Sequence, residues 1–171
     1  MGEDLLKTFG LLFLSAVPVL FSFFLGEEIR QKQNMRKNLL LLFQHILFQI
    51  ENFNRDQKDI FSSFENKDFE KSGFLSDLCN EVSLLPCGAF HRTVEKHLSS
   101  FGFSAPMQDL ILTAAINFGT QGKESQIKEL RNLVEILEKE YEKEKTETEN
   151  KIRITRMVGL TIGIGIFILM L

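Results

Sequence analysis

The sequence lacks the signals of several protein classes. It has no tryptophan, one tyrosine and only two cysteines among 171 residues, which is too few cysteines for a disulfide framework. Alternating runs of valine, isoleucine and threonine are absent, as are the Asn-Gly and Asp-Gly pairs that close hairpins, so no strands are predicted. The net charge of −3 leaves no positive excess that would indicate binding to nucleic acid. These absences favour an all-α protein.

Both ends of the chain are hydrophobic. Eighteen residues from Thr8 to Leu25 carry no charge, and neither do the 15 residues from Met157 to Leu171. As a helix the first run would be about 27 Å long, close to the thickness of the hydrocarbon core of a bilayer. A cleavable signal peptide is disfavoured, because the start, Gly2-Glu3-Asp4, is not basic and no Ala-x-Ala cleavage pattern follows. We therefore expect a transmembrane helix at each end of the chain. The first lies within residues 1–25, which also include a short N-terminal tail, and the second covers residues 157–171.

The lysine and arginine residues that flank the two apolar runs predict their orientation. Only Lys7 lies on the outer side, whereas the inner side is strongly basic, and basic flanks of membrane spans are cytoplasmic. The inner residues expected to face anionic lipid headgroups are Arg30, Lys32, Arg36, Lys37, Lys151, Arg153 and Arg156. The prediction is a cell-membrane protein with two spans, a cytoplasmic centre and both termini outside. The second run is only about 22 Å long as a helix, so entry into a single leaflet is the alternative.

Residues 26–156 form the predicted cytoplasmic domain and contain 40 of the 43 charged residues. Apolar residues at helical spacing predict six helices, and Gly73, Pro86, Gly102 and Pro106 mark ends between them. Short connections favour antiparallel neighbours. The fold prediction is therefore a six-helix antiparallel bundle between two transmembrane helices, with bundle helices over residues 27–53, 56–70, 74–85, 89–101, 106–118 and 123–156.

Two helices of the predicted bundle have distinctive patterns. Apolar residues of helix 27–53, Leu41 and Phe48 among them, cover most of its circumference, which predicts a helix at the centre of the bundle. The last helix has apolar residues at heptad spacing from Ile127 to Tyr141. Residues 142–151 contain no apolar side chain, so this segment is predicted to be a charged stalk that leads without a break into the second span.

Residues that could perform catalysis or bind a metal are few and scattered. His91 and Glu95 share a helix face, but His97 points elsewhere and no HExxH motif is formed. Cys79 and Cys87 do not have CxxC spacing, and in the cytoplasm both are expected to be reduced thiols. We therefore predict no catalytic residue, no metal, no cofactor and no small-molecule substrate. The alternative, a membrane enzyme or ligand-binding bundle, would need an internal polar pocket with converging titratable groups.

Two sets of residues are candidates for contacts with proteins or between helices. The loop before the last helix either caps that helix or contacts a partner, and its candidate contact residues are Gly119, Gly122, Lys123, Glu124 and Gln126. Small residues four apart in the predicted spans would let two helices approach closely, although this spacing also occurs by chance. These helix-packing candidates are Ser22, Gly26, Gly159 and Gly163.

Three motifs follow one another as in a known family. Met35-Arg36-x-x-Leu39-x-x-Leu42-x-x-x-Ile46 comes after the first apolar run, and Gly119-x-x-Gly122-Lys123-Glu124-x-Gln126-x-Lys128 opens the last helix. Gly159-Leu160 then enters the final apolar run. With the order of the segments, these motifs resemble the stage III sporulation protein AB family over essentially the whole chain. Gly122 stands where that family usually has aspartate, and the family's Thr-Pro-Leu and Ala-Trp elements are absent.

The resemblance implies a function and a set of partners. The family is similar to the cytoplasmic domains of type II secretion F-type platform proteins. It implies a non-enzymatic scaffold subunit of the mother-cell-to-forespore channel of endospore formers, in the mother-cell membrane that faces the forespore. The implied partners are other stage III sporulation channel components, including a secretion-type ATPase, the stage III AA protein. The alternative within the same class is a secretion or pilus platform protein unrelated to sporulation, which constitutive expression in growing cells would indicate.

Overall fold

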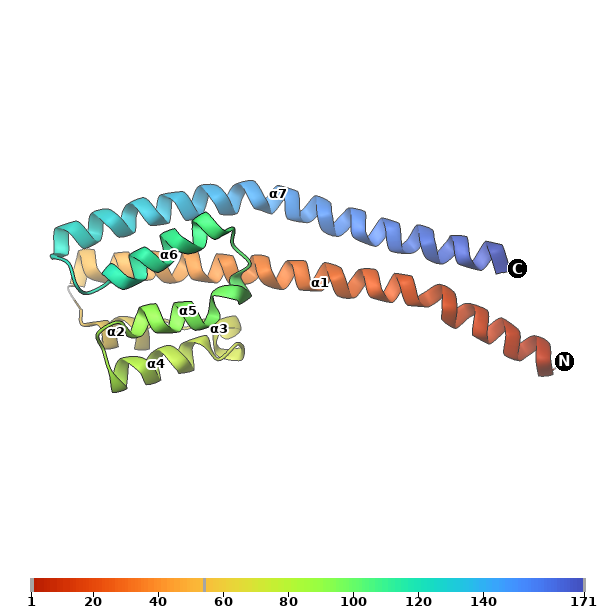
Figure 1. Cartoon of the computed structure of the whole chain (residues 1–171), viewed down its shortest axis with the longest axis horizontal. Helices are drawn as coiled ribbons and strands as arrows, with labels where there is room; N and C mark the ends of the chain where they lie inside the picture. Colours follow the sequence, from red (N-terminus) through yellow and green to blue (C-terminus); the bar gives the residue numbers. More distant parts are fainter. Residues whose placement is uncertain (1, 54, 171) are drawn as a thin grey trace. The chain divides into compact units, whose positions relative to one another are not determined.

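The computed structural model describes residues 2–53 and 55–170, and in these residues it contains α-helices and no strands (Figure 1). This confirms the prediction of an all-α protein. Side chains are described for residues 10, 13–53 and 55–169, so the side chain of Lys7 lies outside the described part of the chain, as do residue Leu171 and other side chains at the start of the predicted first span. The helices are α1 (Gly2–Phe53), α2 (Gln57–Ser62), α3 (Lys67–Lys71), α4 (Phe74–Leu84), α5 (Ala89–Phe101), α6 (Ala105–Asn117) and α7 (Lys123–Met170).

The chain forms two compact units. One unit, called here the terminal helix pair, comprises residues 1–31 and 144–171. The other, the central bundle, comprises residues 32–143. The long helices α1 and α7 contribute residues to both units. The unbroken α7 confirms the expectation that the last bundle helix continues through the charged stalk into the C-terminal apolar run.

Glycine and proline residues define several helix ends in the central bundle. Gly73, Gly88 and Gly102 have positive φ angles of 79°, 72° and 65° beside α4 and α5. Glycine adopts this left-handed conformation without the steric penalty of a Cβ atom. Pro106 lies in the first turn of α6, where its missing N–H group would have no helical partner. Gly73, Gly102 and Pro106 agree with breaks predicted from the sequence, and Gly88 lies two residues after the break predicted at Pro86.

The predicted helix over residues 56–70 is wrong, because the structure divides it into α2 and α3. The Asn66 side chain accepts hydrogen bonds from the backbone nitrogens of Asp68 and Phe69, at 3.1 and 3.0 Å, and so begins α3. At the end of α2, Nε2 of His45 lies 3.1 Å from the carbonyl oxygen of Ile60. A local side-chain cap and a contact from α1 thus satisfy backbone groups that a continuous helix would have paired.

Phenylalanine rings dominate the core of the central bundle. The Phe90 ring meets the ring of Phe43 edge-on and stacks on that of Phe61, with centroid distances of 5.5 and 5.3 Å. Phe69 and Phe74 form a second pair at 4.5 Å. All five rings are at most 2% exposed. Aromatic pairs in these arrangements contribute beyond their buried area, so the ring cluster accounts for much of the packing of this unit.

Helices α1 and α7 each bury one apolar face in this core. Leu39 and Ile46 are fully buried on α1, and Leu130 and Leu137 are 2% exposed on α7. This confirms the helical periodicity, but it corrects the expectation that α1 is packed around most of its circumference. Leu41 and Phe48 are 39% and 53% exposed on α1. The apolar face of α1 is therefore wider than the face that the other helices cover.

One helix, α7, is long and apolar enough to cross a membrane, among the residues searched, which are those the structure describes. Only 17% of its apolar stretch is buried. A core helix of a soluble domain would be mostly buried, whereas a lipid-facing helix keeps its apolar side chains on the outside. Helix α7 is therefore a candidate membrane helix.

Candidate functional site

Within the terminal helix pair, the backbone of α7 approaches α1 at two glycines. A Cβ atom added at Gly159 would lie 2.3 Å from Cβ of Ser22 and 2.8 Å from the carbonyl oxygen of Pro18. At Gly163 it would lie 2.7 Å from the carbonyl oxygen of Ser15. Contacts this short leave no room for any side chain, so only glycine fits at these two positions.

The other two helix-packing candidates are also buried in this unit. Ser22 is 4% exposed, and its hydroxyl donates a 2.7 Å hydrogen bond to the carbonyl oxygen of Val19. Because this bond stays within α1, the hydroxyl needs no partner on α7. Gly26 is less crowded, since an added Cβ would lie 3.5 Å from Cγ2 of Ile152, an ordinary contact. The closest approach of the helices is thus at Gly159 and Gly163.

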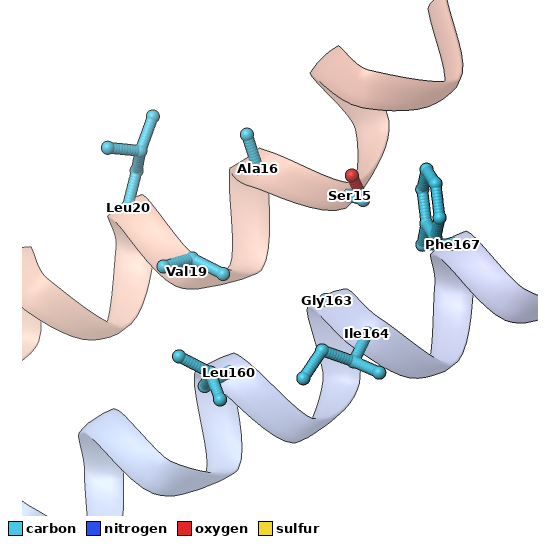
Figure 2. A pocket seen from close by; sticks show the side chains of 8 residues that line it. All are labelled: Ser15, Ala16, Val19, Leu20, Leu160, Gly163, Ile164 and Phe167. Carbon is cyan, nitrogen blue, oxygen red and sulfur yellow. The ribbon is translucent and has the colours of Figure 1, made fainter. Parts of the chain in front are cut away.

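An apolar groove of about 450 Å³ runs along one flank of the terminal helix pair (Figure 2). Almost all of its lining is apolar. Figure 2 shows the two helices side by side, with the lining side chains projecting from each. Prominent among them are Ala16, Val19 and Leu20 of α1 and Leu160, Ile164 and Phe167 of α7.

Arg156 lies one turn before Leu160 on the same face of α7. Its guanidinium carbon is 5.0 Å from the centroid of the Phe23 ring, within the range of a cation–π contact. Its Nε atom is buried and has no hydrogen-bond partner. An unpaired buried donor costs about 1–3 kcal/mol, and more when the group is charged. No sequence motif marks this pairing, because it joins residues far apart in the chain.

The other predicted membrane-facing basic residues divide into two groups. Five are exposed: Arg30, Lys32, Lys37, Lys151 and Arg153. Arg36 is instead directed toward the end of α5, where its Nε donates a 2.9 Å hydrogen bond to the carbonyl oxygen of Phe101 and its Nη2 contacts that of Gly102. Burial lowers the pKa of Arg36, and the charge of Glu140 opposes this shift. Arg36 thus caps the C-terminus of α5 within the central bundle.

The loop between α6 and α7 is a tightly packed turn with an exposed tip. Gly119 has a φ of 78°, and an added Cβ would lie 1.9 Å from the side-chain nitrogen of Gln57. Gly122, Lys123 and Glu124 are exposed, whereas Gln126 is half-buried and its backbone nitrogen donates to the carbonyl oxygen of Gly122 at 3.0 Å. The loop therefore begins α7 and also presents side chains of both charges to solvent.

Asp77, His97 and Lys96 form a surface cluster that the sequence analysis missed. Oδ2 of Asp77 lies 2.7 Å from both Nζ of Lys96 and Nε2 of His97. Hydrogen bonds from Lys96 and then from His97 lower the pKa of Asp77. His91 lies apart, 3.9 Å from Glu95. In the described residues, no group of three or more histidine, cysteine, aspartate or glutamate side chains is arranged to hold a metal ion.

These features define the class as an all-α protein with a candidate membrane helix. The family model of stage III sporulation protein AB matches residues 7–171, nearly the whole chain. The chain therefore belongs to the stage III sporulation protein AB family, as its motifs predicted, and is a sporulation-related protein. This family is of a structural type and is not a known enzyme family. No curated protein and no solved structure matches the chain.

Proposed function

We propose that this chain is a non-enzymatic membrane scaffold subunit of the secretion-like channel complex between mother cell and forespore. Family membership supports the sporulation context. The observation that carries the scaffold role is the close packing of α1 on α7 at Gly159 and Gly163. Two helices in backbone contact form a stiffer anchor than two independent helices, because neither can rotate or slide without separating the pair.

Such an anchor favours assembly of a complex. Binding partners lose translational and rotational freedom when they associate, and flexible partners lose more. A domain held at the membrane by two spans has already lost part of this freedom. We infer that the protein holds residues 26–156 at the membrane for its partners, without itself performing chemistry.

The proposed topology has residues 8–25 and 157–171 as spans in the mother-cell membrane that faces the forespore. Residues 26–156 are then cytoplasmic, and both termini are outside. The five exposed basic residues near the inner ends of the spans support this orientation, because cytoplasmic flanks are basic and the inner leaflet is anionic. Exposure of the apolar stretch of α7 agrees with a lipid-facing surface.

The proposed partner surface is the loop tip and the start of α7. Lys123 and Glu124 are exposed at this position, whereas Gly119 and Gln126 hold the turn in shape. Charged side chains on a rigid support suit a protein contact whose orientation is selected by electrostatic complementarity. We propose that this surface contacts the cytoplasmic secretion-type ATPase and that other stage III channel components contact the anchor.

Cysteine crosslinking in sporulating cells tests this assignment. Cys79 and Cys87 are free and exposed, so both are first replaced by serine to give a background without reactive thiols. Cysteine is then introduced by Lys123→Cys or Glu124→Cys, a crosslinker is added, and the captured protein is identified by mass spectrometry. Capture of the ATPase is expected.

Ser99→Cys is the matched control, because Ser99 is also exposed but lies on α5, away from the loop in sequence. It should not capture the ATPase. Equal capture from Ser99→Cys, or capture of lipid alone from the loop variants, would contradict the proposed contact surface.

A further inference from the structure

We propose that the groove of the terminal helix pair, together with Arg156, is a binding site for one anionic glycerophospholipid. This inference rests on the proposed placement of both apolar segments in the membrane. Arg156 would bind the lipid phosphate, and the groove would hold one acyl chain. The two parts of the site indicate the class of ligand. A charged hydrogen-bond donor lies near an apolar groove, and in a phospholipid a charged phosphate group lies near apolar acyl chains.

Helix geometry places Arg156 and the groove on one flank of the pair. Arg156, Leu160, Gly163 and Phe167 are spaced by four, three and four residues, which keeps them on one face of α7. Phe23 follows Val19 and Leu20 at the same spacing on α1. Arg156 lies over the Phe23 ring, about one helical turn beyond Leu20 and Leu160 at the inner end of the groove lining.

The distance from Arg156 to the far end of the groove suits an acyl chain. Eleven residues separate Arg156 from Phe167, which corresponds to about 16 Å along the helix axis. In the proposed topology Arg156 lies at the inner membrane boundary, where phosphates reside, and the lining residues extend from there into the hydrocarbon region. The groove volume of about 450 Å³ is of the size that small-molecule sites have.

The buried Nε atom of Arg156 indicates an anionic ligand. It has no hydrogen-bond partner in the protein, although a guanidinium group forms its strongest hydrogen bonds with phosphate or carboxylate oxygens. Because Nε lies against Gly26 of α1, a phosphate oxygen would satisfy it once the guanidinium group turns toward the lipid. Glu27 and Glu28 follow Gly26 on α1 and offset part of the local positive charge, so the lipid must be recognised by Arg156 itself rather than by a broad basic surface.

Native mass spectrometry of the purified full-length chain in mild detergent tests the site. Phosphatidylglycerol or phosphatidylcholine with the same acyl chains is added, and the bound lipid is counted. The wild type should retain one phosphatidylglycerol in preference to phosphatidylcholine. Arg156→Gln should weaken this binding roughly tenfold or more, because it removes a charge-assisted hydrogen bond. Ala16→Phe, which fills the groove, should weaken the binding of both lipids.

Arg153→Gln is the matched control, because Arg153 is exposed and its replacement removes the same charge from the same region of α7. It should change phosphatidylglycerol binding less than about twofold, within the range of a screened surface charge. Circular dichroism should give the same helix content for all variants. Equal losses in Arg153→Gln and Arg156→Gln, or equal binding of the two lipids by the wild type, would overturn the site.

Carbonate extraction of cell membranes separates this inference from the function on which it rests. If the wild-type chain remains in the membrane and the two arginine variants bind lipid alike, only the lipid site is wrong. If the wild-type chain is released by carbonate, the membrane scaffold role is wrong as well.

Discussion

A methyl group added at Gly159 should separate the two helices of the terminal pair. It would lie 2.3 Å from both Cβ and Oγ of Ser22, whereas non-bonded carbon atoms pack at about 3.5–4.0 Å. A rotation of the serine side chain cannot relieve this overlap, because Cβ itself is one of the two atoms. The carbonyl oxygen of Pro18, at 2.8 Å, belongs to the backbone and cannot turn away.

The expected loss of packing free energy in Gly159→Ala follows from comparison with a second glycine of the same helix. Gly165 has no atom within 4 Å of an added Cβ, so Gly165→Ala introduces the same methyl group without overlap. Both substitutions gain about 1 kcal/mol of helix propensity. This gain cancels in the comparison, which leaves the overpacking term of about 1–3 kcal/mol for Gly159→Ala relative to Gly165→Ala.

Hydrogen exchange measured by mass spectrometry locates the effect. In Gly159→Ala, amide exchange over residues 14–26 and 155–165 should be roughly 5- to 150-fold faster than in Gly165→Ala. Exchange in the central bundle should be the same in both variants. Equal exchange in the two variants over residues 14–26 would refute the close approach of α1 and α7 at Gly159.

Three further predictions test the central bundle and its surface. Phe90→Ala should lower the free energy of unfolding by about 3–5 kcal/mol, whereas truncation of the exposed Phe48 should cost less than about 1 kcal/mol, as chemical denaturation would measure. Asn66→Ala removes the cap of α3 and should cost about 0.5–2 kcal/mol by the same assay; no change would contradict the capping role. The pKa of Asp77 is lowered in the folded state, so the ionised carboxylate contributes to the free energy of unfolding, by at most about 1 kcal/mol. This contribution should be present above about pH 4 and lost as the pH falls through the folded-state pKa. The stability difference between wild type and Asp77→Asn should therefore shrink in acid, and a constant difference from pH 7 to pH 2 would contradict the ion pair.

Most of the helical architecture could be predicted from local sequence. Gly73, Gly102 and Pro106 act through their own backbone preferences, so the breaks they cause need no knowledge of the tertiary fold. The buried faces of α1 and α7 follow from the spacing of leucine and isoleucine. The division between α2 and α3 could be predicted only in part in this way. It depends on Asn66 and on a contact from His45, which comes from a different helix.

The candidate sites could likewise be predicted only where they depend on local sequence. The spacing of the small residues predicts close packing of the helix pair, and the structure gives the distances between the two helices at each of them. The position of Arg36 along the chain places it among the predicted membrane-facing basic residues. Its bond to the carbonyl oxygen of Phe101 joins residues 65 positions apart. The pair of Asp77 and His97 and the contact of Arg156 with Phe23 also join distant segments, so no local pattern reports them.

Thiol labelling in intact sporulating cells tests the membrane topology on which the scaffold proposal depends. Cys79 and Cys87 are exposed and free, so they serve as natural probes of the central bundle. A membrane-impermeant maleimide should leave both unlabelled in intact cells and label both after the membrane is permeabilised. A cysteine introduced by Gly2→Cys should be labelled without permeabilisation, because the N-terminus is proposed to lie outside. Labelling of Cys79 or Cys87 in intact cells would contradict a cytoplasmic central bundle held between two membrane spans.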